Sequence, residues 1–217
     1  MILFLASYGK REIILFSLLW VFLGGLLGWL FPPAAAVPAC GLLFTLYFFR
    51  DPERKIPEDP QTLVSPADGT VVEISEVPSH DVLGEDSVKI GIFLSVFNVH
   101  VNRAPCAGVV QSVRYTPGKF HDARDPECGK YNEQNAIHID GPIPVVVTQI
   151  AGLIARRIVC AIRETETLQK GQRIGMIKFG SRTDIYIRKS QVSDIQIQLK
   201  DKVFGPRQAN ILAHMQS

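Results

Sequence analysis

The chain has 217 residues, and 23 Lys and Arg against 21 Asp and Glu give a formal net charge of +2 at pH 7. A balance this even excludes the strongly basic face of a typical nucleic-acid-binding protein, so no nucleic-acid partner is expected. The cysteines have no CxxC spacing, which argues against a zinc site or a disulfide framework, and no metal is expected; they are Cys40, Cys106, Cys128 and Cys160.

The N-terminal part is expected to be a transmembrane helical hairpin, because residues 13–49 include no charged side chain. Pro32 and Pro33 divide this run into residues 13–31, long enough for one spanning helix of about 20 residues, and a shorter arm, 34–49, that either spans or re-enters the membrane. Basic residues flank both ends of the run, which places both ends at the cytoplasmic face. A signal peptide is the alternative, but its apolar core is only about 7 to 15 residues long.

Residues 1–49 are therefore expected to anchor the chain, followed by a proline-rich charged linker at 50–62 and one domain at 63–217. In this domain, short runs of β-branched residues alternate with glycine and proline turns, which predicts a mainly β, compact antiparallel barrel or sandwich similar to the hybrid-motif fold. Residues 116–133 are polar and aperiodic and are expected to form a long functional loop. The expected strands are 69–76, 87–94, 109–115, 135–139, 145–150, 154–162, 173–179, 183–188 and 195–199.

Two motifs in the first half of the domain hold groups suited to proton transfer. Asp68 precedes Gly69 where a strand is expected to begin; Asp-Gly is first a turn signal, and a similar turn opens lipoyl-type domains. His100 follows an apolar strand and has Asn98, Asn102 and other polar residues around it. These neighbours are consistent with a polar pocket around the histidine.

A Gly-Ser pair, Gly180-Ser181, lies between two expected strands near the C-terminus and by itself indicates only a turn. A serine Oγ can, however, attack the carbonyl that precedes it and form an ester, and glycine leaves that carbonyl unobstructed. Removal of the Ser181 α-proton then eliminates the ester to dehydroalanine, which hydrolyses to a pyruvoyl group with release of ammonia. A histidine oriented by an aspartate is one general way to supply the base.

In order and spacing, these motifs resemble the phosphatidylserine decarboxylase family in its short form with an N-terminal membrane hairpin. The resemblance runs through FFRDP (48–52), SPADG (65–69), VHVNRAP (99–105), PGKF (117–120), NE (132–133), QIAG (149–152), ARRIV (155–159) and FGSR (179–182). It implies self-cleavage between Gly180 and Ser181 into a β chain, 1–180, and an α chain, 181–217. It further implies Asp68 and His100 as acid-base partners and a covalent pyruvoyl cofactor on residue 181.

The activity implied is decarboxylation of phosphatidylserine to phosphatidylethanolamine, in phospholipid biosynthesis, at the cytoplasmic face of the cell membrane. The diether lipid archaetidylserine is an alternative substrate, and a non-catalytic, membrane-tethered lipoyl or hybrid-motif β domain is an alternative of another class. That module would not cleave itself. The sequence leaves the oligomeric state open.

The chain departs from the long bacterial form of the family, which has Leu-Gly-Ser-Thr at the cleavage site and a His-x-x-His pair. Here Arg103 stands at the second histidine position, so His121 and His138 are alternative proton carriers. Arg103 is also a candidate for binding the lipid phosphate. Arg50 and Arg54 are further candidates, but anchoring the hairpin at the membrane interface explains them equally well.

Overall fold

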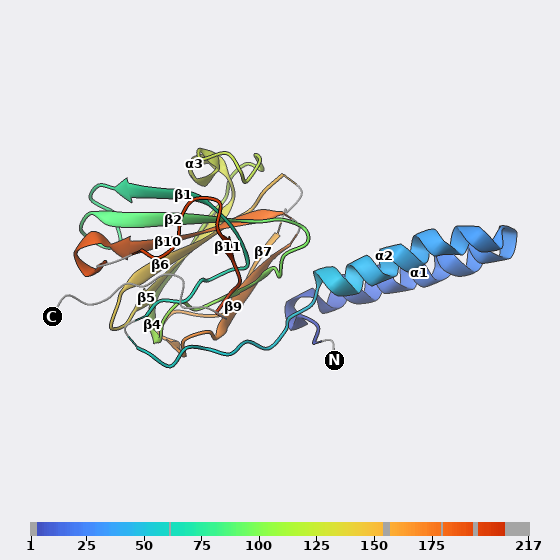
Figure 1. Ribbon diagram of the computed structural model, residues 1–217, viewed down its shortest axis with the longest axis horizontal. Helices are drawn as coiled ribbons and strands as arrows, with labels where there is room; N and C mark the ends of the chain where they lie inside the picture. The colour runs from blue at the N-terminus through green and yellow to red at the C-terminus, as the bar shows by residue number, and fades with distance from the viewer. Residues whose placement is uncertain (1–3, 61, 154–156, 179, 193–194, 207–217) are drawn as a thin grey trace. The chain divides into compact units, whose positions relative to one another are not determined.

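The computed structural model describes residues 4–60, 62–153, 157–178, 180–192 and 195–206. The chain forms two compact units, Met1–Glu53 and Arg54–Ser217. The first is helical and the second is built from β-strands (Figure 1).

The helical unit is a hairpin of α1 (Lys10–Leu30) and α2 (Ala36–Phe48), joined by the 3-10 turn η2 (Pro32–Ala35) and preceded by the turn η1 (Ser7–Gly9). Phe31 has an extended backbone, with φ −153° and ψ 98°, and Pro32 follows at the start of η2. Proline lacks an amide hydrogen and disfavours a helical conformation in the residue before it. The proline pair therefore ends the first arm, as the sequence predicts.

Small and polar residues hold the two arms of the hairpin together. A Cβ added at Gly41 would lie 2.6 Å from the Trp20 ring, so glycine is needed where the indole crosses α2. The indole N–H of Trp20 donates to Thr45 Oγ1 at 3.1 Å, and this hydroxyl donates to the Gly41 carbonyl at 2.9 Å. These polar groups of the hairpin thus form hydrogen bonds with one another, as they must in an apolar environment that offers no water.

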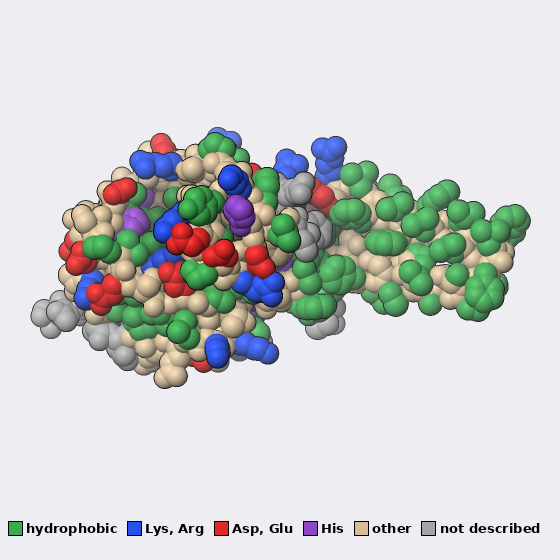
Figure 2. Space-filling model, turned by 90° about the horizontal axis from the view of Figure 1, so that it is seen from above, with side chains coloured by type: hydrophobic (Ala, Val, Ile, Leu, Met, Phe, Trp, Pro, Cys, Tyr) green, Lys and Arg blue, Asp and Glu red, His purple; other side chains and the backbone are tan. Residues whose placement is uncertain are grey.

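One helical segment among the described residues, Ser7–Leu30, is long and apolar enough to cross a membrane by length and composition, with 24 residues and a mean hydropathy of 2.3. The apolar helix Pro32–Phe48 is shorter. Hydrophobic side chains cover the visible face of the hairpin in Figure 2. Such a surface is expected of helices that contact lipid.

The β unit consists, in its described part, of a curled eight-stranded sheet and a three-stranded sheet, all antiparallel, which confirms the mainly β prediction (Figure 1). The large sheet has the order β11 (Lys202–Val203), β1 (Gly69–Val77), β2 (Ser87–Leu94), β10 (Ser181–Arg188), β6 (Val145–Ile150), β5 (Gln134–Asp140), β4 (Gly108–Thr116) and β8 (Thr167–Leu168). The small sheet has the order β3 (Val101–Arg103), β9 (Arg173–Lys178) and β7 (Arg157–Cys160).

Eight of the nine expected strands coincide with observed ones, although residues 154–156 and 179 of two of them lie outside the described residues. The expected strand at 195–199 is wrong. Ile197 is buried against the core, but the strand-like contact with β1 comes later, through Lys200 N to Val71 O and then β11. The alternating apolar residues at 195–199 therefore reflect packing against the core and not pairing in a sheet. The strands β3, β8 and β11 were missed because two or three residues are too short to show a period of two.

The central strand β10 separates two chemical environments. Ile185 and Ile187 belong to the hydrophobic core, and successive side chains of a strand point to opposite faces, so Ser181 shares the core face. Arg182 and Asp184 point to the other face. The expected long loop at 116–133 covers that second face, where it includes the one-turn helix α3 (Cys128–Tyr131).

Candidate active site

The predicted cleavage pair lies where the small sheet passes into the large one, between β9 and β10. Gly180 has φ +65°, in the left-handed region that favours glycine, and a Cβ there would meet no atom within 4 Å. Conformation, and not space, therefore requires glycine at this position. The Gly180 carbonyl oxygen packs against Gly152, where a Cβ would approach it to 2.4 Å. Gly152 thus leaves room for the carbonyl that Ser181 would attack, a role that the sequence did not reveal.

Ser181 is the first residue of β10, pairs with Leu94 of β2 and is completely buried. Its Oγ has no hydrogen-bond partner among the residues that the structure describes. Buried hydroxyls are normally hydrogen-bonded, so an unpaired one calls for an explanation. Loss of the hydroxyl on conversion of this residue to a pyruvoyl group would break no side-chain hydrogen bond among the described residues. The position therefore fits that group.

His100 lies beside this pair. Its Nδ1 is 2.9 Å from the Asn98 carbonyl oxygen, and the Gly180 amide N–H donates to its Nε2 at 3.4 Å. The first contact requires a proton on Nδ1 and the second a lone pair on Nε2, which together define one neutral tautomer. The Asn98 side chain accepts hydrogen bonds from the amide and hydroxyl of Ser95, which fixes the loop that holds the ring. The structure therefore brings His100 and Gly180 together, with the basic nitrogen toward the cleavage pair.

Asp68 precedes β1 and is 5% exposed. One of its carboxylate oxygens lies 2.7 Å from Arg54 Nη2, in an ion pair whose side chains are 9% and 7% exposed. This pairing shows that the Arg54 guanidinium is buried in the β unit and is engaged by a carboxylate. The sequence did not predict this partner for Asp68, because Arg54 lies in the expected linker, 14 residues before Asp68.

The two alternative histidines are placed differently. His138 on β5 pairs in register with Val146, which pairs with Tyr186, five positions along β10 from Ser181. At about 3.4 Å per residue, that separation is roughly 17 Å, too far for proton transfer to Ser181. The backbone of His121 is held in the 116–133 loop by Asn132, whose Oδ1 accepts from the His121 amide at 2.8 Å.

A buried chain of polar side chains runs along the core face of the sheets. Asn102 on β3 donates to Thr183 Oγ1 at 3.0 Å and accepts from Gln149 Nε2 at 2.9 Å. Gln149 Oε1 in turn accepts from Asn135 at 3.2 Å. These bonds link β3, which follows His100, to β10, which begins with Ser181. Sequence analysis missed Gln149 as a site residue because its neighbours made it look like an ordinary strand position.

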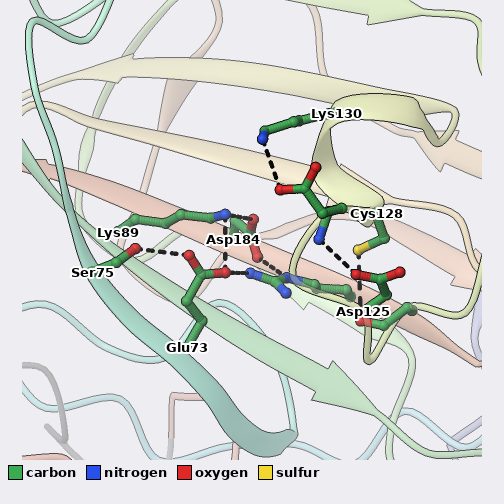
Figure 3. Close-up of polar contacts among 10 residues, drawn as sticks. Glu73, Ser75, Lys89, Asp125, Cys128, Lys130 and Asp184 are labelled. Carbon is green, nitrogen blue, oxygen red and sulfur yellow. Dashed lines mark hydrogen bonds and ion pairs between the residues drawn. The ribbon is translucent and has the colours of Figure 1, made fainter.

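On the opposite face of β10, Arg182 forms a buried cluster with three charged side chains from β1, β2 and β10 (Figure 3). Its Nε donates to Asp184 Oδ1 at 2.5 Å and its Nη2 to Glu73. Lys89 Nζ lies 3.0 Å from Glu73 and 3.4 Å from Asp184. Burial acts to raise the pKa of Glu73, but hydrogen bonds, chiefly from Arg182, lower it to about 2. Glu73 is therefore ionised at neutral pH.

A pocket of about 270 Å³ opens beside the cleavage pair. Gly180, Ala123 and the end of β2 line it, together with the exposed side chains of Arg124 and Leu153. The Arg124 guanidinium, 70% exposed, is paired with Asp122. Arg103, the phosphate ligand suggested by the sequence, is 8% exposed and donates to the Gly171 carbonyl at 3.1 Å. Arg124 thus has the more accessible guanidinium of the two.

Comparisons with known proteins point to one family. The family model described as phosphatidylserine decarboxylase matches residues 42–208. A protein of Desulfotalea psychrophila is 47% identical over 162 residues, 74% of this chain and 75% of its own. One from Pelobacter propionicus is 50% identical over 167 residues, 75% and 74% of the two chains, and one from Rhodopirellula baltica is 43% identical over 199 residues, 90% and 82%. Each is named phosphatidylserine decarboxylase proenzyme. The chain belongs to the phosphatidylserine decarboxylase family.

Proposed function

We propose that this chain is a proenzyme that cleaves itself between Gly180 and Ser181 and then decarboxylates phosphatidylserine to phosphatidylethanolamine. One observation carries the proposal: a buried serine with an unpaired Oγ follows a left-handed glycine, beside the unprotonated nitrogen of His100. The relatives named as proenzymes support processing of the precursor and argue against a non-catalytic lipoyl-type module.

Self-cleavage uses only groups of the chain. Ser181 Oγ, losing its proton to His100, attacks the Gly180 carbonyl carbon, and the peptide C–N bond breaks to give an ester and a free amine on residue 181. A base then removes the α-proton of residue 181, and the Oγ–Cβ bond breaks to leave a carboxylate on Gly180 and dehydroalanine at 181. Hydrolysis of dehydroalanine releases ammonia and yields the pyruvoyl group. We assign Asp68 to favouring the charged states of these steps electrostatically.

During turnover, the pyruvoyl carbonyl supplies an electron sink for the electron pair left when the substrate carboxylate departs as carbon dioxide. The chain's residues hold the substrate and return the proton. His100 Nε2 lies 3.4 Å from the Gly180 amide nitrogen, next to residue 181, and we assign this histidine to protonation of the substrate α-carbon. The pocket beside Gly180 would take the headgroup, with Arg124 at its wall suited to the lipid phosphate. Arg103 stays a predicted substrate contact.

Membrane anchoring gives the enzyme access to a diacyl substrate, since extracting a lipid costs about 0.8 kcal/mol per CH₂. We assign the hairpin to this role, with the β unit on the cytoplasmic face. The headgroup chemistry is the same for a diether serine lipid, so archaetidylserine stays an alternative substrate. Assays on vesicles of each lipid distinguish the two.

The direct test of the proposal is the intact mass of the purified wild-type protein. Two pieces are expected, residues 1–180 and residues 181–217, the second with a terminal ketone instead of an amine. The ketone should react with hydroxylamine, and the α chain should resist Edman sequencing. An active preparation that consists of the uncleaved chain with an intact Ser181 would rule out the proposed cofactor.

Deletion of residues 1–49 should release the protein from membranes. Activity on vesicles of long-chain phosphatidylserine should fall by about 10²-fold or more, because the anchor provides a high local substrate concentration. Activity on a short-chain soluble analogue should change little, since the site residues described above all lie beyond residue 53. Flotation with liposomes and the two assays measure these effects. Equal losses on both substrates would contradict a purely positional role for the hairpin.

A further inference from the structure

Arg182, the residue directly after the proposed cleavage point, is completely buried, which is rare for arginine. Its guanidinium fork donates to Asp184 through Nε and to Glu73 through Nη2, and its buried Nη1 has no hydrogen-bond partner among the described residues. The fork lies over Gly91, where a Cβ would come within 2.3 Å of Nη2. Gly91 is also the cross-strand partner of both Glu73 and Asp184. The fold therefore provides a space shaped for this side chain.

The cluster joins the two pieces that cleavage would produce. Glu73 and Lys89 lie on β1 and β2, within residues 1–180, whereas Arg182 and Asp184 lie on β10, after the cleavage point. Cleavage at residue 181 would make Arg182 the second residue of a new chain. A strand end normally frays when its chain connection is lost. Here the ion pair with Glu73 acts one residue from that end.

The ion pairs of Arg182 with Glu73 and Asp184, which we call the clamp, leave the face of β10 that carries residue 181 clear. Side chains 181 and 182 point to opposite faces of the strand, so Arg182 restrains the backbone without occupying the space around residue 181. Figure 3 shows Glu73, Lys89 and Asp184 converging on one face of the sheet. Arg182 also pairs in register with Phe93 of β2 and with Ile150 of β6. The end of the new chain is thus held from both neighbouring strands and from one face.

We propose that Arg182, clamped between Glu73 and Asp184, is a positioning residue that fixes the backbone of residue 181 both for self-cleavage and for turnover. This inference rests on the proposed function. Catalysis depends on placing reacting atoms accurately, and a displacement of about 1 Å can cost about 10²-fold in rate. Loss of the clamp should therefore lower the rate constants more than it lowers substrate affinity.

The chain offers a matched control on the same strand. Glu76 of β1 pairs with Lys189 just after β10 at 2.6 Å, so this ion pair also joins the two pieces. The side chain of Lys189 is 50% exposed and that of Glu76 is 65% exposed, and Lys189 lies seven residues beyond Arg182 along the chain. Exposed pairs of this kind contribute little. Glu76→Gln therefore removes an ion pair between the pieces without touching the clamp.

The experiment compares Glu73→Gln with Glu76→Gln in the full-length protein. Self-cleavage is followed on SDS gels, and kcat and KM are determined per pyruvoyl group, counted by hydroxylamine titration. Glu73→Gln should slow cleavage and lower kcat per pyruvoyl by about 10-fold to 10²-fold with little change in KM, and Glu76→Gln should match the wild type. Arg182→Lys, which keeps the charge but has one donor nitrogen in place of Nε and Nη2, should cleave and turn over at intermediate rates.

The outcomes separate the alternatives. If Glu73→Gln and Arg182→Lys lose only resistance to urea, with wild-type kcat per pyruvoyl and wild-type cleavage, the clamp is merely structural and the proposal is overturned. If Glu73→Gln fails to fold, Arg182→Lys alone decides on the same criteria. An uncleaved but active wild-type chain would instead overturn the proposed function, and this inference with it.

Discussion

Ser181→Ala should leave the chain at full length and without decarboxylase activity. Alanine has no nucleophilic oxygen, so neither the ester nor the pyruvoyl group can form. Without the cofactor, activity should fall by at least about 10⁶-fold, to the background rate. The fold should be retained, because the Ser181 Oγ has no described hydrogen bond to lose and the position is fully buried. Intact mass, circular dichroism and release of carbon dioxide from phosphatidylserine measure the three effects.

The structure provides a matched control for this substitution. Ser87, at the opposite end of the β2–β10 ladder, is also completely buried, and its Oγ has no partner among the described residues. Ser87→Ala should therefore cleave and turn over normally. Ser181→Thr keeps a hydroxyl but adds a methyl group in a buried place, so it should cleave slowly and give an α chain one CH₂ heavier. Cleavage of the Ser181→Ala protein at the same bond would show that the hydroxyl is not the nucleophile.

His100→Ala should slow both self-cleavage and turnover, each by about 10² to 10⁴-fold, the usual effect of losing a general acid-base group. The expectation follows from the Nε2 lone pair, which faces the Gly180 amide, and from the fixed tautomer of the ring. The two steps need separate measurements, because a chain that does not cleave has no cofactor. Assaying the small cleaved fraction per pyruvoyl group, or supplying residues 181–217 as a preformed chain, separates them.

His138→Ala is the matched control for His100, because His138 is also a strand-associated histidine but lies roughly 17 Å along the sheet from Ser181. It should behave like the wild type. Asp68→Asn keeps a side chain of similar size and removes the charge, so slower cleavage would indicate an electrostatic role. If His100→Ala cleaves normally and each pyruvoyl group turns over at the wild-type rate, His100 is not the proton carrier, and His121 becomes the next candidate.

Local sequence patterns were sufficient to predict most of the strands and the arms of the hairpin. Strand β2 and strand β6 begin and end at the predicted residues, because a short run rich in β-branched residues marks a strand that is buried along most of its length. The proline pair at 32–33 likewise marks the turn of the hairpin, since proline acts on its immediate neighbours. The resemblance to the family also rests on sequence, because its motifs keep their order and spacing.

Only the tertiary structure decided which distant residues meet. Charged residues such as Arg182 and Asp184 are usually exposed, yet both are fully buried because the loop at 116–133 covers that face of β10. Glu73, the partner of Arg182, is 109 residues away in the sequence. Gly152, which packs against the Gly180 carbonyl, follows the end of β6. The periodicity of apolar residues indicates which face of a strand is buried, but not which residues pack against that face. Strand order, set by long-range packing of the whole sheet, determines that.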